Sequence, residues 1–287
     1  MLALQLLANG IVTGSALGVV AISFALIYAT TRVFHVAHAG VYTLGGYLAW
    51  SLMRHGVPDI VALPAAMAGC VAIGAAIQIF LYAKLERRGA AQLVVLIASL
   101  GTLAVIQNLI AAIYSPDILD FASPWAGHVF VLPAGLRLTG VQIATVLVDF
   151  AAFGATLWFA HRTLLGKRIR AVASNPFLAE ITRLEPRRVH VYVMAIASAL
   201  VCLPGVLGPL DYGLQPYGGV TPLLTATIAM IAGGIGSLAG AFGLAVAIVV
   251  LQNLALLVMP GEWSIGVTFA IFVVFMLFRP RGLFAGG

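Results

Sequence analysis

The stretch that decides the fold is LQLLANGIVTGSALGVVAISFALIYA, residues 4–29, which contains no charged residue. A helix needs about 20 consecutive apolar residues to cross a bilayer. A cleavable signal peptide would begin with positive charge and end at a small-residue cleavage site, whereas here the first basic residue is Arg32, after the apolar run. The stretch therefore predicts a retained first transmembrane helix.

The composition of the whole chain shares this character. Of its 287 residues, 62% are hydrophobic and 8% are charged, whereas about 25% are charged in a soluble globular protein. A soluble protein of this size also needs a polar surface, so that class is excluded. The net charge of +6 does not indicate nucleic-acid binding, because the basic residues lie in short loops between apolar runs. We expect an integral membrane protein with a single transmembrane domain over residues 1–287.

Seven further apolar runs follow, and they cover residues 39–53, 58–83, 91–114, 140–160, 189–209, 221–258 and 264–278. Backbone inside a bilayer must hydrogen-bond to itself, and the alternating short strands of a transmembrane barrel are absent, so the fold is predicted to be all-α. The run 221–258 is too long for one helix, and GGIGSLAG (233–240) interrupts it. We expect a broken or re-entrant hairpin there, and eight or nine membrane-embedded segments in all.

The basic residues indicate the orientation. If the N-terminus is outside, all but two of the 15 lysines and arginines fall in inner loops, and only Arg54 and Arg137 lie outside. Such an asymmetry is typical of cytoplasmic loops. We therefore expect a multi-pass membrane protein with its N-terminus outside and its C-terminus inside.

The longest inner loop covers residues 161–188 and contains a predicted helix. Asn175 and Pro176 suit the cap and first position of a helix, and Pro186 would end it, which predicts a helix over 176–185. Its apolar face would consist of Phe177, Leu178, Ile181 and Leu184. Such a helix can lie on the membrane surface or fit a groove of a partner protein, and we favour the partner. The outer loop 115–139 is interpreted as a lid, a docking surface or an ordinary connection.

Catalytic signatures are missing from the sequence. The nearest match to a phosphate-binding loop, HRTLLGKRIR (161–170), lacks the first glycine and has Arg168 where Ser or Thr is required. There is no HExxH, no GxSxG and no cluster of paired carboxylates. Cys70 and Cys202 lie in apolar runs and are interpreted as core residues. We expect a non-catalytic chain without a cofactor or a bound metal.

Asp149 is the clearest ionisable residue within a membrane run, and a carboxylate at that depth is costly. Two interpretations remain open at this point. Asp149 could face a substrate pathway and bind an ammonium group, or it could hold helices together through a polar neighbour. The candidate neighbours are Gln107, Asn108, Gln252 and Asn253.

Four stretches together resemble one family, the permeases of branched-chain amino acid ABC transporters, and in particular the smaller of the two permeases. They are LANGIVTGSALGVVAISFALIYATTRVFHVAHAGVYTLGGYLA (7–49), GKRIRAVASNPFLAE (166–180), GGIGSLAGAFG (233–243) and FRPRGLFAG (278–286). The resemblance covers nearly the whole chain. It implies a second homologous permease subunit, two cytoplasmic ATPase subunits that hydrolyse ATP, and an extracytoplasmic substrate-binding protein.

The resemblance also implies roles for individual residues. The short inner helix would contact an ATPase through Asn175, Pro176, Ala179 and Glu180, with Arg168 and Arg170 flanking the contact and Gly166 included in it. From the residues themselves, with the resemblance supporting His38, we expect a substrate pathway or gate that includes His38, Tyr42, Gln107, Asn108, Asp149 and Asn253. Because small residues let membrane helices approach closely, we expect tight helix packing at Gly14, Gly18, Gly45, Gly46, Gly233, Gly234, Gly236 and Gly240.

Departures from the family pattern put the substrate in doubt more than the fold. Arg183 stands where the family usually has Gly, His35 replaces the usual Asn, and Gln252-Asn253 stand where Glu is common. Permeases for urea and short-chain amides share the architecture and remain an alternative. A stand-alone secondary carrier is a second alternative, and an intramembrane enzyme is disfavoured because Asp149 alone does not make a site.

His35 and His38 are three residues apart in RVFHVAHAGVYTLGGY (32–47). A metal site would need further ligands, and none is near in sequence. We expect both histidines at the cytoplasmic turn between the first two helices, where His38 and Tyr42 would cap backbone groups near the inner gate.

Overall fold

The computed structural model describes residues 1–120, 128–132, 135–279 and 282–284. Within these ranges, seven helical stretches are long and apolar enough to cross a membrane. They are α1 (Leu2–Thr31), the continuous run of α3 (Asp59–Ala76), η1 (Ile77–Tyr82) and α4 (Ala83–Arg87), α5 (Gln92–Tyr114), α6 (Gly140–Arg162), the run of α9 (Pro186–Leu207) and α10 (Pro209–Tyr212), α12 (Leu238–Ala255), and η3 (Gly261–Trp263) with α13 (Ser264–Phe278).

Seven such stretches do not by themselves confirm the predicted eight or nine membrane-embedded segments. The difference lies in α2 (His38–Arg54) and α11 (Val220–Gly233), which have 17 and 14 residues. Both are shorter than the roughly 20 residues that a full span requires. The described residues thus hold seven long apolar stretches and two helices that are too short for a full span.

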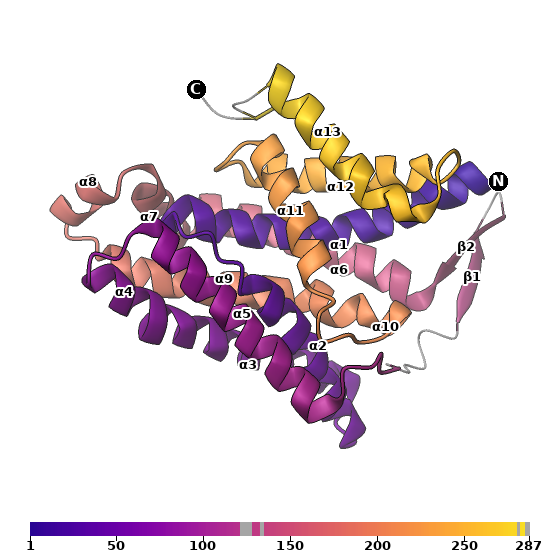
Figure 1. Ribbon diagram of the computed structural model, residues 1–287, viewed down its shortest axis with the longest axis horizontal. Coiled ribbons are helices and arrows are strands. Elements are labelled where there is room, and N and C mark those ends of the chain that lie inside the picture. The colour runs from indigo at the N-terminus through magenta and orange to yellow at the C-terminus, as the bar shows by residue number, and fades with distance from the viewer. Residues whose placement is uncertain (121–127, 133–134, 280–281, 285–287) are drawn as a thin grey trace.

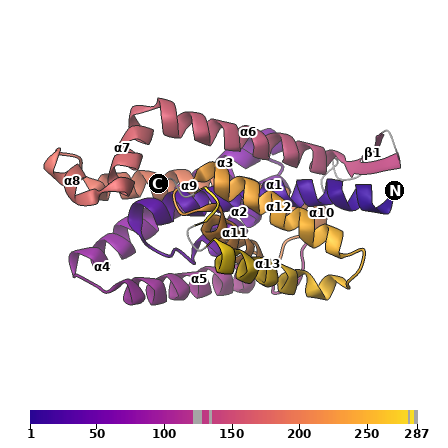
Figure 2. The same cartoon turned by 90° about the horizontal axis from the view of Figure 1, so that it is seen from above.

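Helix α1 forms the centre of the bundle. In its most apolar stretch 78% of the residues are buried inside the chain, against 6% for the stretch that ends in α13. It packs against α12, α9, α11 and α6, and seen from above it lies between α6 on one side and α5 and α13 on the other (Figure 2). The stretch 4–29 thus forms the core of the protein, and α13 lies at its edge.

Helix α2 begins deep inside the bundle because the chain folds back after α1. Arg32 ends α1 in a left-handed conformation with φ 57°, and an irregular segment, residues 32–37, then runs back beside α1. His38, the first residue of α2, contacts Ser23, which is eight residues before the end of α1, or about 12 Å along its axis. The segment between α1 and α2 therefore enters the bundle, and it is not a surface turn.

Helices α11 and α12 form a tight hairpin, as the glycine-rich interruption predicts. The turn covers residues 234–237, and Gly234 and Gly236 adopt φ of 104° and 103°, values that suit glycine. After α13, the C-terminal segment returns to this hairpin: the backbone N–H groups of Leu283 and Phe284 donate to the carbonyls of Ala232 and Gly233 at 3.0 and 3.1 Å. These bonds satisfy carbonyls that the end of α11 leaves open.

A small two-stranded sheet accompanies the helices of a chain that is otherwise mostly helical, as the all-α prediction requires. Strands β1 (Val129–Leu132) and β2 (Leu136–Thr139) pair antiparallel in the predicted outer loop, with Val129 opposite Thr139. Residues 121–127 and 133–134 of that loop lie outside the described residues. The hairpin ends in Thr139, whose side chain caps α6 by accepting from the N–H of Gln142.

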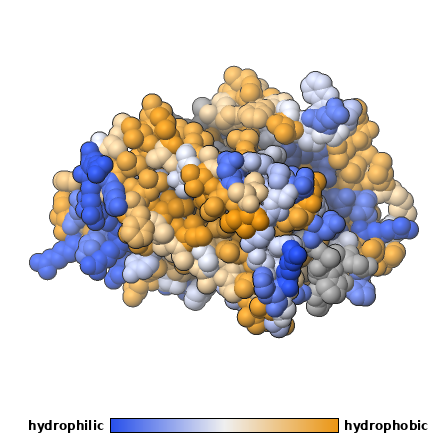
Figure 3. Space-filling model, turned by 60° about the horizontal axis from the view of Figure 1, so that its bottom comes forward, coloured by the Kyte–Doolittle hydropathy of each residue, from blue (hydrophilic) through white to orange (hydrophobic). Residues whose placement is uncertain are grey.

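The two ends of the long axis are formed by different elements, and the surface between them is largely hydrophobic. The hairpin β1–β2 and the N-terminus lie at one end, and α4, α7 (Leu164–Ser174) and α8 (Pro176–Ile181) lie at the other (Figure 1). On the face drawn in Figure 3, hydrophobic residues cover the middle and hydrophilic residues gather at the left end. We name the end formed by α4, α7, α8 and the start of α9 the basic end, because it holds Lys84, Arg87, Arg88, Arg168, Arg170, Arg183, Arg187 and Arg188.

Candidate functional site

The corner between α6 and α7 is built around one glycine. Thr163 caps α7 by accepting from the N–H of Gly166 at 3.0 Å. Gly166 is buried, and a Cβ there would lie 2.8 Å from Cα of Ala160 and would also collide with the carbonyl of Phe159. Gly166 is thus buried at the sharp turn between α6 and α7. It offers no surface for the ATPase contact that was expected of it.

The next short helix, α8, starts as predicted and ends earlier. Asn175 caps it by accepting from the N–H of Leu178 at 3.1 Å, and Pro176 is its first residue. It ends at Ile181, and not at residue 185, because Arg183 takes a left-handed conformation with φ 60°. The N–H of Leu184 then donates to Ala179 at 3.0 Å and that of Arg183 to Glu180 at 3.0 Å, the bonding of a Schellman end.

The outer surface of α8 is apolar. The side chains of Phe177, Leu178 and Ile181 are 68%, 57% and 65% exposed, whereas Ala179 is 4% exposed and packs within the chain. Among the other residues expected to contact an ATPase, the exposed ones are Arg168, Arg170, Asn175, Pro176 and Glu180. An exposed apolar face between charged residues, at the basic end, is typical of a helix that docks on another protein.

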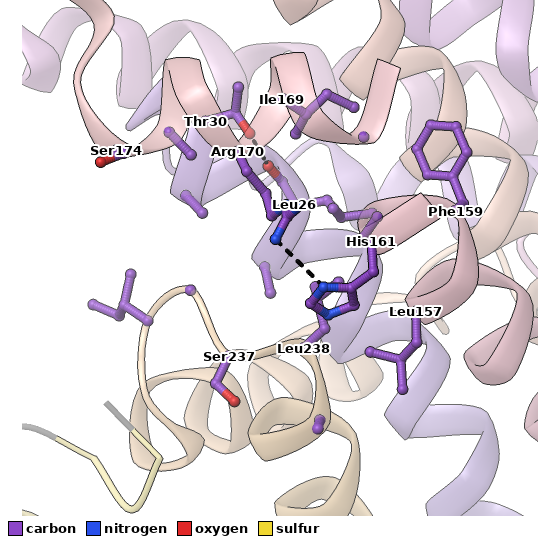
Figure 4. A pocket seen from close by; sticks show the side chains of 18 of the residues that line it. Leu26, Thr30, Leu157, Phe159, His161, Ile169, Arg170, Ser174, Ser237 and Leu238 are labelled. Carbon is purple, nitrogen blue, oxygen red and sulfur yellow. Dashed lines mark hydrogen bonds between the residues drawn. The ribbon is translucent and has the colours of Figure 1, made fainter. Parts of the chain in front are cut away.

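A cavity of about 540 Å³ separates α7 from the α11–α12 turn. Figure 4 shows Leu26 and Thr30 of α1, Ile169 and Arg170 of α7, and Ser237 and Leu238 around it. Arg170 Nη1 lies 3.4 Å from His161 Nδ1 across its rim. On its α1 side, Arg32 Nη2 donates to the carbonyl of Ala173 at 3.5 Å, so one long bond links α1 directly to α7. The cavity leaves α7 room to move relative to the hairpin.

Both histidines of the 32–47 stretch are wholly buried, which corrects their predicted place at a cytoplasmic turn. His38 Nε2 lies 2.8 Å from Ser23 Oγ, and His35 Nδ1 lies 2.6 Å from Tyr82 Oη. The reason is the segment 32–37, which carries the rings into the bundle. Within the described ranges, no three His, Cys, Asp or Glu side chains come together to hold a metal ion.

Tyr42 lies one turn beyond His38 and links α2 to α10. Its hydroxyl is 2.9 Å from that of Tyr212, and the side chain of Tyr42 is 7% exposed while that of Tyr212 is 63% exposed. Gly205 lets the backbone of α9 lie close to that of α2, because a Cβ there would collide with the carbonyl of Tyr42. His38 and Tyr42 thus share one short helix, with α1 beside the former and α10 beside the latter.

Asp149 pairs with a residue that sequence reasoning did not consider. Ser15 Oγ donates to Asp149 Oδ2 at 3.1 Å, and both residues are wholly buried between α1 and α6. The neighbours proposed from sequence bond elsewhere: Asn108 to the carbonyl of Ala104, Asn253 to that of Val249, and Gln252 to Ser264 and Thr268. Gln107 is buried, and its Nε2 has no partner among the described residues. This arrangement favours a helix-holding role for Asp149.

The glycines expected to pack helices lie mostly at close crossings. An added Cβ would meet Cα of Val246 at 2.9 Å from Gly14, the ring of Phe242 at 2.5 Å from Gly18, and the backbone of Gly240 at 2.5 Å from Gly233. Gly45 and Gly46 face Cys202 and Gly205, and Gly234 lies against Gly282. Gly236 differs, since nothing lies within 4 Å of its Cβ position. Its positive φ in the turn, and not close packing, explains that glycine.

Comparison with known proteins identifies the family. The model of the family described as "Branched-chain amino acid transport system / permease component" matches residues 6–276. The chain is 28% identical to the high-affinity branched-chain amino acid transport system permease protein BraD of Pseudomonas aeruginosa, over 98% of this chain and 95% of that protein. It is also 28% identical to the permease protein LivH of Escherichia coli K12, over 98% and 94% of the two chains.

A solved structure supports the fold. The chain is similar to PsaBC from Streptococcus pneumoniae in complex with Fab, with a TM-score of 0.54 over 96% of this chain and 93% of that chain. At 15% sequence identity, this likeness concerns the fold alone. Together with the family match over residues 6–276 and the seven apolar helical stretches, these findings show that the chain is a multi-pass membrane protein that belongs to the permease-component family of branched-chain amino acid transport systems.

Proposed function

We propose that the chain is the smaller permease subunit of an ABC importer that moves branched-chain or other hydrophobic amino acids across a bacterial inner membrane. The observation that carries this function is the exposed apolar face of α8 at the basic end. By the positive-inside asymmetry this end is cytoplasmic, with the N-terminus outside and the C-terminus inside. Residues 1–287 act as one permease domain.

The partners follow from the same surface. Two ATPase subunits take up α8 of this chain and the equivalent helix of a second homologous permease. An extracytoplasmic substrate-binding protein delivers the amino acid at the opposite end. The names of the BraD and LivH relatives support the substrate class, and the absence of a phosphate-binding loop in the sequence agrees with an energy source in another chain.

The geometry supplies a path for coupling. When the ATPases close, they push on Phe177, Leu178 and Ile181, and α8 transmits this push to α7. At the Gly166 corner α7 packs directly against the end of α6, and Arg32 links α7 to the end of α1. The segment 32–37 and α2 follow α1, so the movement reaches the contact between Tyr42 and Tyr212, which we propose as part of a gate.

Reconstitution tests this function. The chain, its second permease and the ATPases are placed in proteoliposomes with ATP on the ATPase side and substrate-binding protein with radiolabelled leucine on the other. We expect uptake that requires ATP and all partners. Competition by excess urea or acetamide, but not by valine or isoleucine, would favour an amide permease. Gradient-driven uptake by the chain alone would show a secondary carrier and would contradict the proposal.

A further inference from the structure

A second, smaller cavity lies at the basic end, apart from the surface of α8. Its volume is about 260 Å³, and it is enclosed by the end of α1, η1, α4, the start of α5 and the start of α9. Binding pockets for drug-sized ligands start near 300 Å³, so this cavity suits a ligand of metabolite size. One wall comes from a π-helix, η1, a rare form that is frequent at functional sites.

Two deeply buried side chains of the wall have polar atoms without a partner among the described residues. Gln78 is 2% exposed and its Oε1 accepts no hydrogen bond, and His190 is 8% exposed with an unpartnered Nε2. Such groups destabilise a folded protein when nothing satisfies them. Both residues line the cavity, and a turn of either side chain toward it would let a ligand that donates hydrogen bonds satisfy these acceptor atoms.

The charges of the wall define the ligand further. Glu86 supplies a carboxylate, 4.0 Å from His190 Nδ1, and Arg32 supplies a guanidinium that, within the described ranges, makes the long contact with Ala173. A ligand with one positive and one negative group matches this pair, because charge-assisted hydrogen bonds are the strong ones. Val33 and Val95 add apolar surface to the wall.

We propose that this cavity binds an α-amino acid with an aliphatic side chain from the cytoplasm, and that its occupancy slows uptake. The ammonium group donates to Glu86 and, once the amide of Gln78 turns toward the cavity, to Gln78 as well. The carboxylate meets Arg32, and the side chain lies on the valines. The inference rests on the proposed function, since it makes the imported product an inhibitor of its own import.

The link to transport is the neighbouring histidine. Tyr82 lines the cavity, and its hydroxyl is 2.6 Å from Nδ1 of His35 in the segment that leads into α2. A ligand wedged between Arg32 and Glu86 holds this segment against η1 and α4. Because α2 must follow α1 for the gate to move, an occupied cavity resists the conformational change, which is a coupling between two sites.

Binding is measured first, on the purified permease–ATPase complex without substrate-binding protein, by equilibrium binding of radiolabelled leucine. We expect competition by valine and isoleucine, and at least tenfold weaker competition by leucinol, 4-methylpentanoate and glycine, which lack the carboxylate, the ammonium group and the aliphatic side chain. The variants Glu86→Gln and Gln78→Leu should each raise Kd about tenfold or more, which corresponds to about 1.4 kcal/mol. Asp59→Asn, an exposed carboxylate at the other end of the same helical run, is the matched control and should leave Kd unchanged.

Inhibition is measured in proteoliposomes, as the ratio of initial uptake with leucine preloaded on the ATPase side to uptake without preloading. This ratio should fall several-fold in the unmodified complex and return toward 1 in Glu86→Gln and Gln78→Leu. ATP-driven uptake with a ratio of 1 in every variant would overturn the regulatory role and leave the proposed function intact. Unchanged leucine binding in both variants would overturn the site itself. Absence of any ATP-driven uptake would instead count against the proposed function, and the binding experiment would still decide the site.

Discussion

Ser15 on α1 donates a hydrogen bond to Asp149 on α6 at 3.1 Å, and both side chains are wholly buried. Asp149→Asn keeps an oxygen that can accept from Ser15, so we expect uptake within about twofold of the unmodified complex. Ser15→Ala removes the donor and should lower stability by about 1 kcal/mol, within the range measured for hydrogen bonds between membrane helices. Thermal unfolding in detergent and leucine uptake check the two effects. A large loss of uptake in Asp149→Asn without a loss of stability would instead show a direct role in the pathway.

At Gly240 the backbone of α12 lies directly against the backbone of α11. A methyl group there would collide with the carbonyl of Gly233 and lie 3.0 Å from the ring of Phe284. We expect Gly240→Ala to destabilise the protein by about 1–3 kcal/mol, as overpacking does. Gly243 on the same helix is the control, because nothing lies within 4 Å of its Cβ position. Gly243→Ala should be neutral or slightly stabilising, since alanine favours helix. Equal melting temperatures for the two variants would contradict this account of the hairpin.

Arg183 holds the left-handed position that ends α8, with φ 60°. That conformation costs a residue with a Cβ roughly 1–2 kcal/mol, so Arg183→Gly should stabilise the end of α8 by about 1 kcal/mol. Hydrogen exchange at the amides of Arg183 and Leu184, which close the helix end, should become slower. Arg187→Gly, within the first turn of α9, is the control and should destabilise, because glycine there is helical. Faster exchange at Leu184 in Arg183→Gly would refute the strain argument.

Ile181 is 65% exposed on α8, so its side chain contributes little to the stability of the isolated chain. We expect Ile181→Ser to leave the melting temperature within about 2 °C, in keeping with surface substitutions away from special features. The same variant should lower ATP-driven uptake at least fivefold, because it removes the apolar contact with an ATPase. Ile181→Val retains that contact and should restore most of the uptake. Normal uptake in Ile181→Ser would show that α8 lies on the membrane surface instead.

The membrane class, the boundaries of most long helices and the cap at Asn175 could be predicted because they depend on local properties. An uncharged run such as 4–29 has to be a helix in a bilayer, and Asn-Pro can satisfy a helix start without any distant partner. The turn at residues 234–237 could be predicted for the same reason, since glycine concentrates the required φ values in a few positions.

Features that depend on contacts between distant parts of the chain could not be predicted in full. The sequence predicts that Asp149 lies within the membrane-embedded part, and it is buried. Its partner Ser15, however, is 134 positions away and carries no sequence signal that would mark it. The polar wall of the smaller cavity was missed altogether. Gln78, Tyr82 and His190 appear in the sequence as isolated polar residues within apolar runs, and that isolation was the available signal.

The sequence by itself determined that this chain is a multi-pass membrane protein of helices, because hydropathy and charge asymmetry act on each segment separately. Only the tertiary structure decided where the chain turns back into the helix bundle after α1. The segment 32–37 runs back along α1, so His35 and His38 lie in the core and not at a surface turn. The physical reason is that a short polar segment is stable inside a bundle only when other helices satisfy it. Those partners, Ser23 on α1, Tyr82 on η1 and Ser99 on α5, come together only when the chain has folded.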